Sequence, residues 1–264
     1  MKQLLLIGCL FMGASSVMAQ RGYVERAIQK NYEKKYGEDG EKKGNAWIND
    51  HLLNVDIEKS YTFPTYVKMH MTEYKNGKAK SESDLQYYFN APGNIVAFKA
   101  IDDKKKKSDE QFIIYDYVKN AMIMLNEKDK TGMAMNLNAF RSQESIDRRN
   151  EELKSGKQSK GNTDCKATGK TKNIRGYNCA EYVCYDAKRN TRSEVWVTTK
   201  ITFNGQKMDA RHPLWAYYGG RNYSGMMMEG RFYEGDELTS TIEVMDINTA
   251  ANYRVNTTEY NFNH

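Results

Sequence analysis

The sequence has 264 residues, of which 39% are hydrophobic, 28% charged and 12% aromatic, and its formal net charge is +6. The abundance of Tyr, Phe and Trp excludes a fully disordered chain, and a total of three prolines excludes collagen-like and proline-rich classes. The length fits one β-rich domain or two small ones. After the first twenty residues, no apolar stretch approaches the length of a membrane span.

The N-terminus has the pattern of a secretory signal peptide. Met1-Lys2 is basic, residues 4–12 are apolar, and small residues precede a cleavage position after Ala19. Residues 6–9 also resemble a lipobox, but the apolar segment before Cys9 is shorter than a usual signal core. We therefore expect residues 1–19 to be removed and the mature protein to lie in the periplasm or cell envelope. Lipid anchoring at Cys9 is the disfavoured alternative.

Three cysteines remain after such a cleavage: Cys165, Cys179 and Cys184. In an oxidising compartment we expect one disulfide and one thiol left over. Cys179 and Cys184 are five residues apart and would point to opposite faces of a strand, so we do not expect them to pair with each other. Cys165 could pair with either of them, and the candidate bridge that we name is Cys165–Cys179.

The N-terminal segment 20–60 is predicted to be helical. Apolar residues recur at helical spacing from Arg21 to about Tyr36, which predicts an amphipathic helix. The charged, glycine-containing stretch Gly37–Gly44 predicts a break after it.

From Tyr61 onward, apolar and polar residues alternate with a period of two, which is typical of half-buried strands. Asn76-Gly77 is a strong hairpin signal. Later predicted strands are Ile95–Ile101, Phe112–Val118, Met122–Leu125, Met133–Leu137, Ala167–Asn173, Tyr177–Tyr185, Glu194–Thr199, Met226–Tyr233 and Leu238–Met245.

These elements predict a mostly β fold with flanking helices. A sheet of about ten antiparallel strands would curl or split rather than stay flat. We expect residues 61–264 to form a curved antiparallel sheet or incomplete barrel, interrupted by a polar connector at residues 138–163.

Three segments carry a family resemblance. Tyr115–Leu125 is a strand–turn–strand that ends in a Met/Ile run, and Thr168–Thr198 contains the pattern Lys-Thr-x-x-Ile-x-Gly-Tyr-x-Cys-x-x-Tyr followed by Glu-Val-Trp-Val-Thr. Gly230–Asp246 is similar to the closing hairpin of the same family. The sequence resembles the exported bacterial family called domain of unknown function 4412, which has no established activity. Its strand plan resembles the LolA/LolB envelope carriers, so the resemblance implies a curved, incomplete barrel that holds acyl chains.

On such a sheet, a concave face would carry an apolar set rich in methionine, a flexible side chain that suits irregular apolar ligands. The candidate ligand cavity comprises Val67, Met69, Met71, Leu85, Tyr87, Phe89, Met122 and Met124. We expect a non-enzymatic protein that binds a lipid, an acylated protein or another apolar ligand there. The same residues could instead fill the core of a ligand-free structural or interaction module. As a further alternative, repeated Met-x-Met patterns could bind or sense a soft metal such as Cu(I).

Other chemistries find no support in the sequence. Gly169-Lys170-Thr171 resembles the end of a phosphate-binding loop, but Asp164 stands where its leading glycine would be. His51, His70 and His212 match no metal-ligand spacing, and we expect His70 to face solvent. We therefore predict no catalytic residues, no metal, no cofactor and no nucleic-acid partner.

Overall fold

The computed structural model describes residues 17–50, 54–90, 92, 94–101, 111–137, 163–187, 189–201 and 225–262. Most of the predicted signal peptide, Cys9, His51, His212 and nearly all of the predicted connector at 138–163 lie outside these residues. The chain divides into two compact units. The first comprises Met1–Tyr61, Asp103–Ala139 and Arg254–His264, and the second comprises Thr62–Asp102 and Phe140–Tyr253.

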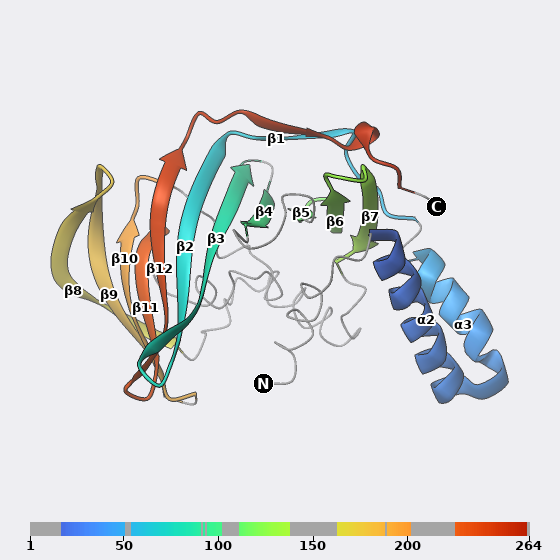
Figure 1. The fold of residues 1–264 in the computed structure, drawn as a ribbon, viewed down its shortest axis with the longest axis horizontal. Helices are drawn as coiled ribbons and strands as arrows, with labels where there is room; N and C mark the ends of the chain where they lie inside the picture. Colours follow the sequence, from blue (N-terminus) through green and yellow to red (C-terminus); the bar gives the residue numbers. More distant parts are fainter. Residues whose placement is uncertain are drawn as a thin grey trace, which may run out of the picture. The chain divides into compact units, whose positions relative to one another are not determined.

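The second unit is built on a run of eight antiparallel strands, which lie side by side and form a curved sheet (Figure 1). Their spatial order is β4-β3-β2-β12-β11-β10-β9-β8. The mostly β, curved antiparallel fold that the sequence predicts is thereby confirmed. The strands are β2 (Thr65–Lys75), β3 (Lys78–Asn90), β4 (Ile95–Ile101), β8 (Thr163–Ile174), β9 (Tyr177–Asp186), β10 (Thr191–Thr198), β11 (Met226–Glu234) and β12 (Glu237–Asn248).

Tight turns connect several of these strands. Asn76 and Gly77 have φ values of 53° and 71°, and Arg175 and Gly176 have values of 52° and 84°. Two consecutive positive φ angles are typical of the two-residue turn whose twist matches that of a hairpin. The predicted hairpin at Asn76-Gly77 is thus confirmed, and Arg175-Gly176 forms the corresponding turn between β8 and β9.

The first unit combines three strands with helices. These three strands are a run of a larger sheet, in the order β7-β6-β5, and their side chains are largely buried on both faces. Helix α2 contains the predicted amphipathic helix and contacts β6 and β7. The elements are α2 (Val17–Tyr36), η1 (Gly37–Asp39), α3 (Gly40–Ile48), β5 (Gln111–Asp116), β6 (Ala121–Asn126), β7 (Thr131–Asn136) and η4 (Thr257–Glu259).

The predicted break at Gly37–Gly44 is wrong in its second half, because α3 begins at Gly40. Gly40 and Gly44 are buried, and a Cβ atom at either position would collide with α2, at Glu33 and Gln29 respectively. These two glycines therefore allow the close approach of two helices rather than ending one.

Strands β1 (Ser60–Phe63) and β13 (Tyr253–Asn256) form a separate two-stranded sheet, and the chain passes from one unit to the other within each of them. Within the first unit, the N–H of Thr257 donates to the carbonyl of Lys59 at 3.0 Å. The hydroxyl of Thr257 donates to the carbonyl of Glu58 at 2.5 Å.

Strand β5 ends at Asp116, two residues before the predicted end at Val118. The Oδ1 atom of Asp116 accepts the N–H groups of Val118 at 3.0 Å and Lys119 at 2.9 Å, which forms a turn. The hydroxyl of Tyr61 donates to Oδ2 of the same carboxylate at 3.2 Å. Asp116 is only 1% exposed, so these bonds satisfy the oxygen atoms of a buried carboxyl group.

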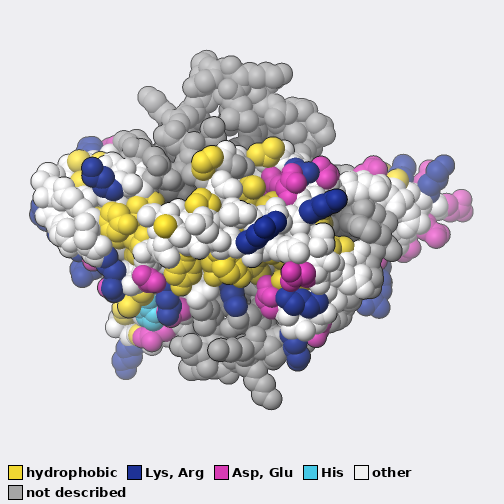
Figure 2. All heavy atoms as spheres, turned by 90° about the horizontal axis from the view of Figure 1, so that it is seen from above, with side chains coloured by type: hydrophobic (Ala, Val, Ile, Leu, Met, Phe, Trp, Pro, Cys, Tyr) yellow, Lys and Arg dark blue, Asp and Glu magenta, His cyan; other side chains and the backbone are white. Residues whose placement is uncertain are grey.

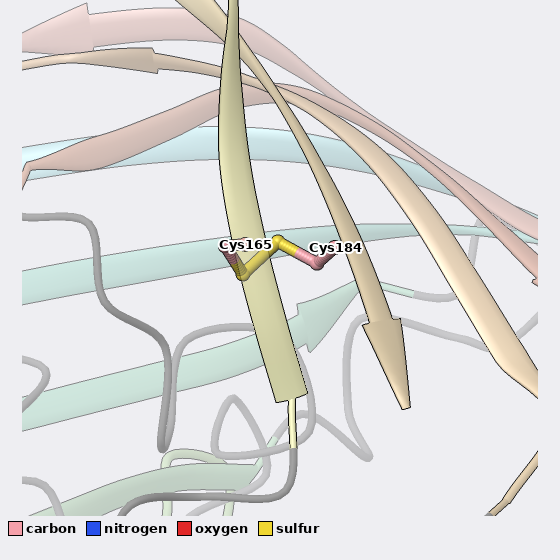
Figure 3. Close-up of a disulfide and its surroundings, with 2 residues drawn as sticks. All are labelled: Cys165 and Cys184. Carbon is pink, nitrogen blue, oxygen red and sulfur yellow. A yellow bond between two sulfur atoms is a disulfide. The ribbon is translucent and has the colours of Figure 1, made fainter. Parts of the chain in front are cut away.

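The disulfide joins Cys165 on β8 to Cys184 on β9, which corrects the candidate bridge Cys165–Cys179 (Figure 3). The strand register explains the pairing, because Cys165 lies directly opposite Cys184 with 3.9 Å between their Cα atoms. Cys179 lies opposite Lys172 instead and keeps a free, buried thiol. This is the other of the two pairings that the sequence left open for Cys165.

Candidate functional site

The apolar face of the second unit brings together six of the eight predicted cavity residues. On β2 and β3, Val67 lies opposite Tyr87 and Met69 lies opposite Leu85. Met71 and Phe89 follow at two-residue spacing, so they share this face. The face continues onto the neighbouring strands through Val96 and Phe98 on β4 and Ile242 and Val244 on β12.

Exposure changes along this apolar face. Val67, Met69 and Tyr87 are at most 1% exposed. Met71 and Leu85 are only half-buried, although they lie on the same face. The apolar surface therefore passes from fully buried positions to positions that water reaches. Large side chains at the margin of a packed region are where an apolar ligand could make its first contact.

Aromatic rings stiffen the buried part of this face. The rings of Tyr87 and Phe89 are stacked with centroids 6.1 Å apart, and Tyr87 and Phe98 are 6.0 Å apart. Pairs at these separations contribute stabilisation beyond the area that they bury. Met69 lies diagonally across the strands from Tyr87, and Met71 lies one step further from the rings. A flexible thioether therefore adjoins the rigid aromatic group.

The other two predicted residues, Met122 and Met124, belong to the first unit. They lie on β6, where Met122 is opposite Met135 and Met124 is opposite Met133 on β7. Met124, Met133 and Met135 are nearly fully buried. Burial among apolar strands favours a packing role for these thioethers. Among the described residues, no group of three or more His, Cys, Asp and Glu side chains is arranged to hold a metal ion.

The opposite, polar face of β2 and β3 contains an arrangement that the sequence analysis missed. The Nδ1 atom of His70 lies 2.8 Å from Oδ1 of Asp84, and Nζ of Lys68 lies 2.6 Å from Oδ2. His70 lies on the polar face, where its side chain is 34% exposed and pairs with Asp84. Burial raises the pKa of Asp84, but the hydrogen bonds from Lys68 and His70 outweigh it and lower the pKa overall.

The same imidazole approaches a hydroxyl on its other side. Oγ1 of Thr72 is 3.4 Å from Nε2 of His70, which is long for a hydrogen bond. The order Thr72–His70–Asp84 is that of a nucleophile, a base and an orienting acid. Thr72 is only 7% exposed, so its side chain has little contact with solvent. The arrangement therefore orients His70 on the sheet surface.

Cys179 lies on the polar side of β9 and lacks the features of an activated thiol. Its side chain is fully buried, and its Sγ atom lies 3.4 Å from the carbonyl of Tyr177. Burial, followed by the charge of Glu229, raises the pKa of the Cys179 thiol. Lys172 pairs with Glu229 and lies 4.4 Å above the ring of Trp196. A neutral thiol under an ion pair is a packed group rather than a nucleophile.

Gly169-Lys170-Thr171 lies within strand β8 rather than at the start of a helix. Nζ of Lys170 is 3.3 Å from Oε2 of Glu181, so the lysine pairs with a neighbouring carboxylate. A phosphate-binding loop needs backbone N–H groups at a helix start, and this segment places its N–H groups along an edge strand. In the part of the chain that the structure describes, no helix combines the length and the apolar character needed to cross a membrane.

Comparison with known proteins gives one family and a set of distant structures. The family model for a domain of unknown function, DUF4412, matches residues 63–208. Matching solved structures include PNGF-II (14% identity, 72% of this chain and 28% of that chain, TM-score 0.33). They also include MucB in complex with MucA(peri) (9% identity, 77% of this chain and 54% of that chain, TM-score 0.35).

A third matching structure is the LolA superfamily protein NE2245 from Nitrosomonas europaea, with 9% identity and a TM-score of 0.25. The match covers 74% of this chain and 88% of that one. This chain thus spans 28% of the PNGF-II chain and 54% of the MucB chain. A search of curated proteins found no match.

Proposed function

The chain belongs to the family described as domain of unknown function DUF4412, and from this premise we propose that it is an exported, non-enzymatic envelope protein that binds an apolar ligand. The site is the apolar face of the curved sheet in the second unit. The ligand class is the acyl chain of a lipid or of an acylated protein. The predicted signal peptide, with cleavage after Ala19, supports export.

The observation that carries this proposal is the change in exposure along β2 and β3. Met71 and Leu85 continue the apolar set to half-buried positions, next to the polar end of the face at Ser83 and Glu73. An acyl chain that entered beside them would exchange water contact for contact with a flexible thioether and an aliphatic side chain. Each buried methylene would contribute about 0.8 kcal/mol.

Native mass spectrometry of the mature protein, purified from the envelope, tests the proposal directly. We expect a mass larger than that of the polypeptide, and release of an acyl lipid in a one-to-one ratio on denaturation. A clean polypeptide mass would contradict a permanently bound ligand. It would favour the alternative in which the same residues fill the core of an interaction module.

A titration with a fluorescent fatty-acid analogue locates the site. Met71→Lys and Leu85→Lys each place a charge at the half-buried margin and should weaken binding at least tenfold, since a charge is costly in an apolar contact. Glu82→Lys is the matched control, because Glu82 is exposed and lies opposite Thr72 on the polar face. Wild-type affinity in both margin variants would contradict the site, provided that circular dichroism shows them folded.

The second candidate function is binding of a soft metal, and the cross-strand pairs Met122–Met135 and Met124–Met133 are the observation that favours it. Thioethers are ligands that Cu(I) accepts. Elemental analysis after incubation with Cu(I) should then show one bound ion, which Met124→Leu with Met133→Leu would remove. Changing Met69 and Met71 to Leu tests the same chemistry in the second unit. If Cu(I) bound in neither unit, acyl-chain binding would remain as the only one of these two candidate functions.

A further inference from the structure

Three tyrosines of the second unit form a connected group, the tyrosine platform: Tyr66, Tyr88 and Tyr253. Tyr66 and Tyr88 lie directly opposite each other on the polar face of β2 and β3, with ring centroids 5.3 Å apart. The ring of Tyr253 lies against Tyr88 at 4.5 Å. Tyr88 is buried between its neighbours, whereas Tyr253 is 37% exposed and Tyr66 is half-buried.

The platform is held rigidly. Phe63 packs against Tyr88 at 6.1 Å, and the hydroxyl of Tyr88 donates to Oε1 of Gln86 at 3.0 Å. The central ring is therefore fixed from both ends, and the two outer rings rest on it. A ligand that stacked on Tyr66 or Tyr253 would meet surfaces that are already ordered, which lowers the entropy cost of binding.

Hydrogen-bonding groups continue from the platform along the same face. One step along the strands, Lys68 lies opposite Gln86, and one step further His70 lies opposite Asp84. Two residues advance a strand by about 6.6–6.8 Å, so these groups lie within reach of a ligand that stacks on the rings. Burial and the neighbouring Asp246 raise the pKa of Tyr66, which keeps its hydroxyl protonated and able to donate.

The charges beside the platform are nearly balanced. Lys68 pairs with Asp84 and lies opposite Asp246 on β12, and His70 also contacts Asp84. Figure 2 shows hydrophobic side chains at the surface between acidic and basic groups on one face of the molecule. A strongly anionic ligand would meet the carboxylates of Asp84 and Asp246. Mixed donors and acceptors beside aromatic rings suit a neutral ligand that is rich in hydroxyl groups.

We propose that the tyrosine platform, with Lys68, Gln86 and Asp84, is a binding site for a neutral oligosaccharide of pyranose units. The apolar face of one sugar ring stacks on Tyr253 or Tyr66. Hydroxyl groups of the adjoining unit donate to Asp84 and accept from Lys68. This site lies on the opposite face of β2 and β3 from the apolar residues, so it is independent of acyl-chain binding.

Isothermal titration of the full mature protein with cellohexaose and with chitohexaose tests the proposal. We expect binding of at least one of these neutral hexasaccharides. Tyr253→Ala should weaken it about tenfold, the order of magnitude of an aromatic contact, while Tyr253→Phe retains most of it because the ring is kept. Tyr185→Ala is the matched control, since Tyr185 is an exposed tyrosine of strand β9 outside the platform.

Two results would overturn the proposal. One is the absence of heat and of intrinsic-fluorescence change with both hexasaccharides at millimolar concentration. The other is equal weakening of sugar binding by Tyr253→Ala and Tyr185→Ala, which would show that the sugar does not bind at the platform. Polygalacturonate serves as an anionic probe, and tighter binding of it than of the neutral sugars would also contradict the charge argument. Loss of fatty-acid binding in Leu85→Lys with retained sugar binding would separate the two sites.

Discussion

Nε of Arg175 donates to the backbone carbonyl of Val244 at 3.0 Å, across 69 residues of sequence. Arg175 is a turn residue with a φ of 52°, a left-handed conformation that glycine and asparagine adopt more readily. The carbonyl that it reaches lies where the register between β12 and β2 shifts, next to Val244. The arginine thus supplies a donor at a point where the regular ladder of the sheet is interrupted.

Replacing this arginine separates its two effects. Arg175→Ala removes the side-chain donor and keeps the unfavourable φ, so we expect a loss of about 1–2 kcal/mol in the free energy of unfolding. Arg175→Asn also removes the bond but tolerates the left-handed conformation better, so it should lose less. Urea unfolding measures both. Arg189→Ala is the control, because that exposed arginine lies in another turn and its Nε atom is 3.8 Å from Asp186.

The disulfide should stabilise the second unit through its edge strand. Cys165 and Cys184 are separated by 19 residues, and a loop of this size corresponds to about 3 kcal/mol in the chain-entropy account. Reduction with dithiothreitol should therefore lower the urea midpoint of the wild-type protein. The same reagent should leave the midpoint of the variant Cys165→Ser/Cys184→Ser unchanged. Peptide mapping that linked Cys165 to Cys179 would contradict the assignment.

The positions of the strands could be predicted from local alternation, but the contacts between them could not. The predicted strand Ile95–Ile101 has the bounds of β4, because its pattern needs no distant partner. The partner of Cys165 depends on a register shift between Ala167 and Thr171. This shift changes which residues of β8 and β9 lie opposite each other. No local pattern reveals such a bulge reliably.

The pairing of His70 with Asp84 also could not be predicted from local alternation. Counting back from the two-residue turn at Asn76-Gly77 places Ser83 opposite His70. A one-residue register shift between Glu73 and Tyr74 moves Asp84 into that place. The same shift puts Met69 opposite Leu85, so a single inserted residue determines both the polar pair and part of the apolar face.

Close contact between β7 and the C-terminal residues leaves no room for a side chain at Gly132. A Cβ atom there would lie 2.5 Å from Cε1 of Phe262, and the N–H of Gly132 donates to the carbonyl of Asn261 at 3.0 Å. Gly132→Ala should therefore lower the unfolding free energy by about 1–3 kcal/mol, as overpacking does. In a Phe262→Ala background the same change should cost much less. Additive effects in this double-mutant cycle would show that the ring is not the obstacle.

The stability contributed by Asp84 should depend on pH. Its pKa is lower in the folded protein, so its ionised form favours folding. This contribution is complete above the unfolded-state pKa of about 3.9 and is lost as the pH falls through the folded-state value. Asp84→Asn should be about 0.5–1 kcal/mol less stable than wild type at pH 7. The difference should shrink on acidification below pH 4.

Urea unfolding at pH 7, 5 and 3 measures this dependence. Asp164→Asn is the control, because Asp164 is exposed and lies 3.5 Å from Lys166. We expect that variant to follow the wild-type curve at every pH. A deficit in Asp84→Asn that stayed constant from pH 7 to pH 3 would mean that the lost stability comes from packing and not from charge.

The C-terminal contacts of the first unit can form only after the C-terminal residues have been synthesised. Arg254 bonds to Ser60 across 194 residues at 3.2 Å, and Thr131 on β7 is bridged by Asn261. Strand β7 therefore leaves the ribosome long before the residues that cover part of its edge. During synthesis that edge can pair with other chains, since an unpaired strand is a template for association. The edge is covered only once the residues around Asn261 have been made.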